Sequence, residues 1–294
     1  MTFINVLKVI LFGIIEGITE WLPVSSTGHL ILFDRFCPIK GVSEGFAELF
    51  EYLIQLGAIF AVVVLFWNKL FPLGKNDESA KIGENGEIKG KIVWKKDVLS
   101  MWLKVLVACV PALFAIVIDK AFEKLSPLSV TTIIAGALIV YGIVFIFVEK
   151  WNEKRNAKIT EMAELSYKYA FFIGCFQVLA AIPGTSRSGI TIIGALLLGV
   201  NRTTAAEFTF FLAIPTMVGT SAYKILKFLM DEGSIAAAEF GYLAIGMVVA
   251  FAVSMVAIKF LMNFVKKHDF KVFGIYRILL GAVVIGALVI PALV

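Results

Sequence analysis

The sequence predicts an all-α polytopic membrane protein with six transmembrane helices and two re-entrant helix hairpins in an inverted repeat. Three observations predict this fold class. Apolar residues make up 60% of the 294 residues, only 17% are charged, and polar turns interrupt two of the apolar stretches. A soluble monomer of this size cannot bury so much apolar surface. The composition therefore excludes a soluble enzyme, a disordered chain and a disulfide-rich secreted scaffold.

Six apolar stretches are long enough to cross a bilayer, since a spanning helix needs about 20 residues. They lie at 46–68, 98–118, 130–148, 204–228, 240–262 and 272–294. Two further segments, 3–33 and 168–200, each consist of two short apolar halves around a Pro/Gly/Ser-rich turn. Irregular backbone at membrane depth is tolerated where it lines a cavity or is buried in protein. We therefore interpret both segments as re-entrant hairpins.

The loop charges predict the topology. Loops 69–97, 149–169 and 263–271 contain seven, five and three Lys or Arg residues, whereas loops 119–129 and 229–239 contain two and none. Basic loops face the cytoplasm. With six crossings, both termini lie outside, the first hairpin enters from the outer face and the second from the inner face. The net charge of +5 then belongs to the inner loops. No basic cluster is interleaved with aromatic residues for nucleic-acid binding.

A hairpin followed by three spans occurs twice, which predicts repeats at 1–150 and 151–294 with the second one inverted. Sequence support is faint: Pro23 and Pro183 each begin a hydroxyl-rich turn. Inverted repeats place their binding site at mid-membrane between the broken segments. The alternative is that Gly- and Ala-rich spans resemble each other by chance.

Two carboxylates are the first candidate site residues. Glu16 and Glu20 are four positions apart in an apolar segment, so a helix places them on one face. Ionisable groups in apolar spans are costly and indicate function. This pair could hold a divalent cation such as Mg²⁺, act as acid and base, or shuttle a proton. Alternatively, one of them caps or salt-bridges a helix end.

A hydroxyl-rich turn follows directly, with the sequence Ser25-Ser26-Thr27-Gly28-His29. Consecutive hydroxyl and N–H groups at a helix start can cradle a phosphate. A His close to Ser and Glu is typical of a nucleophile, its base and an orienting group. The alternatives are that the hydroxyls cap the next helix and that His29 is a polar residue at the membrane interface.

The second turn, Pro-Gly-Thr-Ser-Arg-Ser-Gly-Ile-Thr at 183–191, contains Arg187 between Ser186 and Ser188. Arginine is well suited to bidentate phosphate contacts, so this turn predicts an anion site. The alternative is a structural ion pair of Arg187 with Glu16 or Glu20. Taken together, the two turns suit hydrolysis of a lipid phosphoester and also proton-coupled transport of an anion.

The segment Glu16–His29 closely resembles the glutamate-rich motif of the undecaprenyl-diphosphate phosphatase family, the integral-membrane type associated with bacitracin resistance. The turn at 183–191 resembles that family's Pro-Gly-x-Ser-Arg-Ser-x-x-Thr motif. The resemblance implies hydrolysis of undecaprenyl diphosphate to undecaprenyl phosphate and inorganic phosphate. This reaction recycles the lipid carrier for peptidoglycan synthesis and confers bacitracin resistance. The implied location is the bacterial cytoplasmic (inner) membrane, with the site opening to the outer face.

The resemblance also implies roles for residues. The catalytic group would be Glu16, Glu20, Ser26, His29 and Arg187, and the diphosphate contacts would be Ser25, Thr27, Gly184, Ser186, Arg187, Ser188 and Thr191. Attack by Ser26 and by water both stay open, as does a divalent cation on the two glutamates. The alternative function is a transporter or flippase of polyprenyl phosphate or another anion. The Gly-rich spans would also allow a homo-oligomer.

Overall fold

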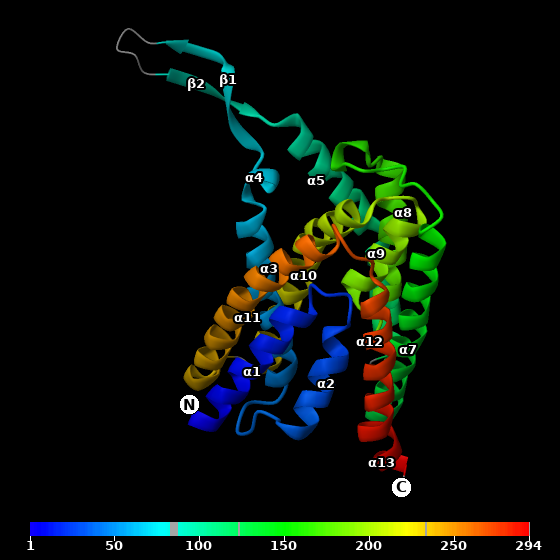
Figure 1. Ribbon diagram of the computed structural model, residues 1–294. Coiled ribbons are helices and arrows are strands. Elements are labelled where there is room, and N and C mark those ends of the chain that lie inside the picture. Colours follow the sequence, from blue (N-terminus) through cyan, green and yellow to red (C-terminus); the bar gives the residue numbers. More distant parts are fainter. Residues whose placement is uncertain (83–87, 123, 233, 294) are drawn as a thin grey trace.

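The structure, a computed structural model, describes residues 1–82, 88–122, 124–232 and 234–293, and helices dominate it (Figure 1). The first seven helices are α1 (Phe3–Thr19), α2 (Ser26–Phe36), α3 (Phe46–Leu65), α4 (Trp67–Leu70), α5 (Lys96–Cys109), α6 (Ala115–Phe122) and α7 (Pro127–Asn152). The others are α8 (Tyr167–Val178), α9 (Arg187–Leu197), α10 (Arg202–Glu232), α11 (Ala237–Phe264), α12 (Lys271–Val284) and α13 (Ile290–Leu293). Short 3₁₀ turns lie at Val110–Phe114, Met162–Glu164 and Leu179–Ala181, and a π-turn at Ile285–Val289 extends α12.

Six helical segments of the described chain are long and apolar enough to cross a membrane, which confirms a multi-pass membrane protein. They are Phe46–Leu65, Lys96–Phe114, Pro127–Asn152, Arg202–Glu232, Ala237–Phe264 and Lys271–Ala292. These segments coincide with the six predicted stretches, although their ends differ by several residues. Large apolar side chains remain exposed on them, for example Phe147 at 67% and Val256 at 69%. Surfaces of this kind indicate contact with lipid rather than water.

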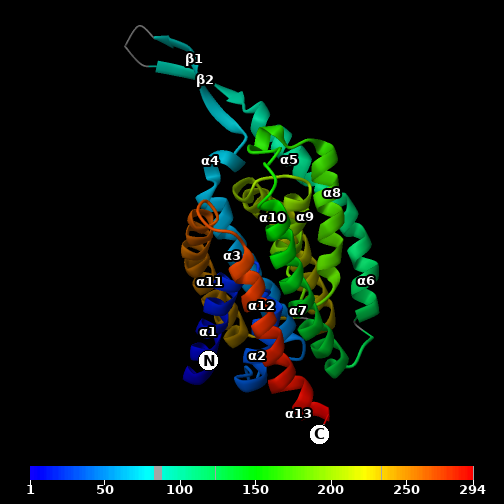
Figure 2. The same cartoon turned by 45° about the vertical axis from the view of Figure 1, so that its right-hand side comes forward.

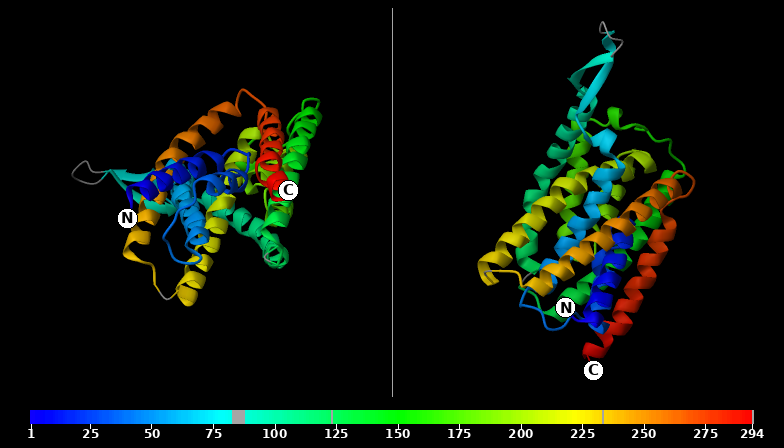
Figure 3. Two further views of the ribbon diagram at one scale, coloured as in Figure 1. Left: turned by 90° about the horizontal axis from the view of Figure 1, so that it is seen from below. Right: turned by 90° about the vertical axis from the view of Figure 1, so that its left-hand side faces the viewer.

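A small hairpin is the departure from the all-α prediction. Strands β1 (Leu73–Ile82) and β2 (Ile88–Trp94) pair antiparallel within the polar segment between α4 and α5. The hairpin extends away from the helical bundle (Figures 1 and 3). Pairing satisfies backbone groups between two strands, and this is allowed here because the segment lies outside the apolar spans.

The two ends of the bundle differ in charge. Both chain termini lie at one end, together with the connections α6–α7 and α10–α11 (Figures 1 and 3). We call this the terminal end. The described parts of the basic loops 69–97, 149–169 and 263–271 lie at the opposite end, which we call the basic end. Helix α1 leads from the terminal end to mid-height and α2 leads back, so their polar turn lies inside the bundle.

Close helix packing positions these turns. Helix α11 packs on α1 and α3, α10 packs on α3, and α12 packs along α7. Figure 2 shows α5 and α8 side by side, and these two helices also contact each other. In the α7–α12 pair the backbones approach at Gly142 and Gly274. A Cβ built on either glycine would lie 2.7 Å from the carbonyl oxygen of the other. Such small-residue contacts are typical of membrane helix pairs.

The approach of α7 to α12 predicts different effects of alanine at two glycines of the same helix. We expect Gly142→Ala to lower the thermal unfolding temperature in detergent, because its methyl group would overpack the α12 backbone at about 1–3 kcal/mol. Gly136→Ala is the matched control, since nothing lies within 4 Å of its added Cβ. Equal unfolding temperatures for the two variants would contradict this packing.

Candidate active site

The two polar turns have the same local geometry. Ser25 precedes α2 and Ser186 precedes α9, with φ angles of 74° and 69°. These are the two non-glycine residues with positive φ in the described chain. Each serine caps its helix: Oγ of Ser25 accepts from Gly28 N–H at 3.4 Å and that of Ser186 from Gly189 N–H at 3.2 Å. Positive φ is uncommon for serine, and strained backbone of this kind gathers at functional sites. Helices α2 and α9 therefore begin in the same way, each directly after a polar turn.

The Glu20 carboxylate joins these two N-termini. Ser26, the first residue of α2, donates from Oγ to Glu20 Oε2 at 2.8 Å. Arg187, the first residue of α9, donates from Nη2 to Glu20 Oε1 at 2.7 Å. Ser188 Oγ donates to the Glu20 carbonyl at 3.0 Å. Four of the predicted site residues, from two segments far apart in the chain, are thus brought into direct contact.

Arg277 lies behind the two turns and holds them together. Its side chain on α12 is fully buried, with 0% exposure. Nη2 donates to the carbonyls of Gly184 and Thr185, both at 2.9 Å, and Nη1 donates to the carbonyl of Pro23 at 3.4 Å. These carbonyls belong to both turns. The guanidinium therefore satisfies backbone acceptors that no helix can satisfy and couples the second turn to the first.

His29 contacts neither Glu20 nor Ser26 by a hydrogen bond in the described structure. Its Nδ1 donates to the Ser25 carbonyl at 2.8 Å. Because a carbonyl can only accept, Nδ1 carries a proton. Nε2 lies 2.7 Å from the Tyr276 hydroxyl and accepts a hydrogen bond from it when the ring is neutral. The Tyr276 ring stacks on the imidazole, with centroids 5.6 Å apart. The imidazole thus has a defined orientation at the start of α2.

Glu16 lies one helical turn before Glu20 and is fully buried. Neither of its carboxylate oxygens has a hydrogen-bond partner among the described residues. Unpartnered buried carboxylates are costly and need a proton or a ligand. Within the described residues, no group of three or more His, Cys, Asp and Glu side chains could hold a metal ion. Two carboxylates with phosphate oxygens would nevertheless suit Mg²⁺.

The other predicted contact residues lie around this centre. Gly184 has a φ of +87° and lends its carbonyl to Arg277. The hydroxyls of Ser186 and Ser188 are 3.2 Å apart, and Thr27 is exposed. The Thr191 hydroxyl donates to the Arg187 carbonyl and is hydrogen-bonded to the Thr209 hydroxyl of α10, both at 2.9 Å. Its visible role is to fix α9 on α10.

Comparison with known proteins places this chain in a family. The family model described as "Bacitracin resistance protein BacA" matches residues 9–283. The chain belongs to the BacA family. Its curated relatives include an undecaprenyl-diphosphatase of Enterococcus faecalis, 55% identical over 97% of this chain and 98% of the relative. Similar relatives of the same name come from Lachnoclostridium phytofermentans, at 50% identity over 97% and 98%, and Streptococcus pyogenes, at 49% over 97% of both chains.

Two residues of the candidate site, Arg277 and Tyr276, are missing from the sequence prediction. The signal for Arg277 was present, since an arginine within the apolar stretch 272–294 is a functional candidate by default. Tyr276 gives no such signal, because tyrosine is common near membrane surfaces. The structure contains an ion pair of Arg187 with Glu20, and the predicted contact of Arg187 with an anion stays a prediction.

The position of Arg277 predicts a local effect of its removal. We expect Arg277→Met to speed amide hydrogen exchange at residues 23–30 and 183–191 at least about tenfold. Buried carbonyls left without donors cost about 1–3 kcal/mol, and this raises local opening. Arg277→Lys should lie between, since one ammonium reaches fewer acceptors.

Arg35→Met, at an exposed position on α2, is the control and should leave exchange unchanged. Unaltered exchange in Arg277→Met would show that the guanidinium does not hold the turns.

Proposed function

We propose that this chain hydrolyses undecaprenyl diphosphate to undecaprenyl phosphate and inorganic phosphate, and so recycles the lipid carrier for peptidoglycan synthesis. Membership of the BacA family and relatives named undecaprenyl-diphosphatase at 49–55% identity support this function. The observation that carries it is the Glu20 carboxylate, held between the first residues of two helices by Ser26 and Arg187. A carboxylate in this position occupies the kind of site that a phosphate prefers.

The diphosphate would bind where the two helix N-termini converge. Each N-terminus carries a partial positive charge and unpaired N–H groups, which bind phosphates. Helices α2 and α9 are 11 residues long. Arg187 is 21% exposed, so its guanidinium can exchange Glu20 for a phosphate oxygen. This contact would neutralise the substrate and stabilise charge on the equatorial oxygens during transfer. Gly184, Ser186, Ser188, Ser25 and Thr27 would complete the contacts.

Ser26 is the proposed nucleophile and Glu20 its base. The 2.8 Å hydrogen bond between them has the geometry of general-base catalysis. Ser26 Oγ would form a bond to the terminal phosphorus while its proton passes to Glu20. The bond from that phosphorus to the bridging oxygen would break, releasing undecaprenyl phosphate. Water would then hydrolyse the phosphoserine and release inorganic phosphate.

His29 is the second group in the proposal that can move a proton. With Nδ1 fixed on the Ser25 carbonyl, Nε2 is the atom that can accept or return a proton. It would assist the attack of water, either on the phosphoserine or directly on the diphosphate. Direct attack is the competing route, in which Ser26 only orients the water.

A divalent cation fits the same site. Glu16, with both oxygens unpartnered, and Glu20 would hold it together with substrate phosphate oxygens. When bound, Mg²⁺ would neutralise phosphate charge. The protein itself would keep Glu16 buried and oriented. Glu16 lies one helical turn from Glu20, whose carboxylate accepts a hydrogen bond from Ser26.

For the architecture, we propose re-entrant hairpins at 3–33 and 168–200 and inverted repeats at 1–150 and 151–294. The matched conformations of Ser25 and Ser186 support equivalent hairpins. The reciprocal approach of Gly142 and Gly274 supports a two-fold relation between α7 and α12. An inverted relation would also bring both broken segments to mid-membrane.

Ion pairs at opposite ends of the α3–α10 pair give independent support for the inverted repeat. Glu48 of α3 pairs with Lys224 of α10 at the terminal end. At the basic end, Glu207 of α10 pairs with Lys69, just after α3, at 2.8 Å. The basic end would face the cytoplasm. The acidic turn would then open to the outer face of the cytoplasmic membrane, because its hairpin enters from the terminal end.

The nucleophile assignment predicts the outcome of a phosphate-release assay with undecaprenyl diphosphate in detergent. We expect Ser26→Ala to lower turnover at least about 100-fold, and acid quenching to trap labelled phosphate on the wild-type protein but not on this variant. Arg187→Ala should also abolish release. Arg187→Lys should retain only part of it, because lysine cannot make the bidentate phosphate contact.

Thr132→Val is the control, since its hydroxyl bonds only its own helix α7. Near-normal turnover of Ser26→Ala would reject the nucleophile and leave direct water attack. No release by the wild type, with lipid movement in vesicles, would instead favour a transporter.

The cation proposal predicts that chelation lowers turnover at least about tenfold and that added Mg²⁺ restores it. Glu16→Gln should raise the Mg²⁺ concentration for half-maximal turnover by about tenfold or more, because one ligand charge is lost. Glu161→Gln, at an exposed position of the 149–169 loop, should respond like the wild type. Turnover that is indifferent to the chelator would reject the cation.

A further inference from the structure

A cavity of about 560 Å³ lies at the basic end, where α3 and α11 finish and α10 starts. Three lysines line it, Lys69, Lys259 and Lys266, together with a single carboxylate, Glu207. None of its lining residues belongs to the two polar turns. The cavity is therefore separate from the candidate active site.

The cavity has an excess of positive charge. Lys69 Nζ donates to both oxygens of Glu207, at 2.8 and 2.9 Å, and so uses up the one carboxylate. In the part of the chain that the structure describes, neither Lys259 nor Lys266 has a carboxylate oxygen within 4.0 Å. Both side chains are exposed. Thr203, in the first turn of the 31-residue helix α10, also lines the cavity and adds a positive helix end.

Apart from Asn263, the rest of the lining is apolar. Leu65 and Phe66 form one wall, and Ile258 and Met262 form another. Next to the cavity, Phe260 is 53% exposed on a face of α11 that would lie in lipid. An anion bound at the lysines would therefore have an apolar surface beside it, which suits a headgroup that is attached to acyl chains and not a free hydrated ion.

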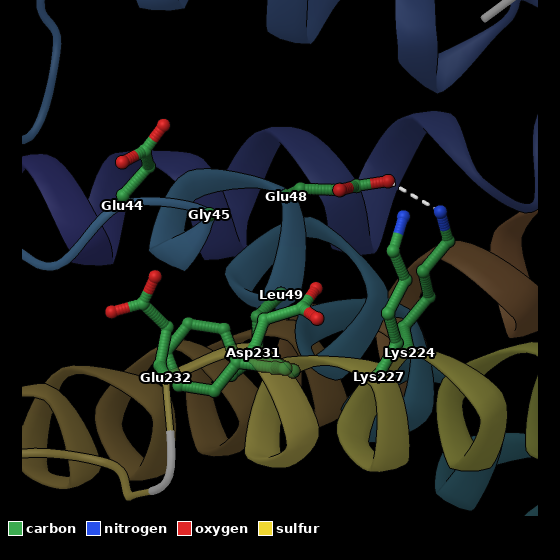
Figure 4. A pocket seen from close by; sticks show the side chains of 9 residues that line it. Glu44, Gly45, Glu48, Leu49, Lys224, Lys227, Asp231 and Glu232 are labelled. Atoms are coloured by element: carbon green, nitrogen blue, oxygen red, sulfur yellow. Dashed lines mark hydrogen bonds and ion pairs between the residues drawn. The ribbon is translucent and has the colours of Figure 1, made fainter.

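The cavity at the opposite end of the α3–α10 pair has a different charge. It is lined by Glu44, Glu48, Asp231 and Glu232 against Lys224 and Lys227, with Glu48 paired to Lys224 (Figure 4). Four carboxylates facing two ammonium groups repel anions. Of these two cavities, only the one at the basic end therefore has a charge that is complementary to an anionic lipid.

From this cavity we propose a second lipid site: Lys259 and Lys266 bind the phosphodiester headgroup of an anionic phospholipid in the leaflet at the basic end. The acyl chains lie against α3 and α11. Basic pockets between membrane helices on the cytoplasmic side bind such headgroups. This inference does not depend on the phosphatase reaction.

The test is a titration of the full-length protein in a neutral detergent with phosphatidylglycerol, read by native mass spectrometry. We expect one tightly bound phosphatidylglycerol, much weaker binding of zwitterionic phosphatidylcholine, and no competition by millimolar inorganic phosphate. The double variant Lys259→Gln/Lys266→Gln should bind phosphatidylglycerol at least about tenfold more weakly.

Lys168→Gln/Lys267→Gln is the charge-matched control, since both lysines are exposed at the basic end but do not line the cavity. It should bind like the wild type. Equal weakening in both double variants would show general surface attraction and overturn the proposal. Displacement by inorganic phosphate, or equal binding of phosphatidylcholine, would overturn it as well. Retained monodispersity of each variant shows that loss of lipid does not reflect misfolding.

Discussion

The candidate site depends on the hydrogen bonds that the Glu20 carboxylate accepts. It accepts from Ser26 at the start of α2 and from Arg187 at the start of α9, so it balances two helix N-termini and a guanidinium inside an apolar bundle. Without an anion there, these positive groups would face each other in a medium of low dielectric constant. In the proposed function, the same carboxylate stabilises the resting protein, yields its place to a phosphate and accepts the serine proton.

Arg277 supports that arrangement by holding the backbone of the two turns together. The two turns expose carbonyls that no helix satisfies, and a buried guanidinium supplies fixed donors to three of them. A lysine has no comparable planar fork. The polar centre is thus built in two layers, with carbonyls and Arg277 behind and hydroxyls, Glu20 and Arg187 in front. Reactive geometry held by such supporting bonds is typical of preorganised sites.

The spans and the two polar turns could be predicted because hydropathy and motif spacing are local properties of the sequence. Contacts between distant segments were less accessible. The pairing of Arg187 with a glutamate was foreseen only as an alternative. The hydrogen bond between His29 and Tyr276 was not foreseen, because it joins residues 247 positions apart. Thr191 fits the family motif, yet its hydroxyl bonds α10, which no motif can indicate. The β1–β2 hairpin was missed because its polar composition is typical of a loop.

The burial of Arg277 has a consequence for biogenesis. Ribosomes deliver both turns to the membrane well before α12, so the donor that joins them is inserted after both of them. An arginine at mid-membrane costs about 2.5–3.5 kcal/mol during insertion. This cost falls once the carbonyls of Pro23, Gly184 and Thr185 accept hydrogen bonds from the guanidinium. Helix α12 therefore enters most easily after the rest of the bundle has assembled. The two turns are therefore joined only after α12 has packed against α2 and α7.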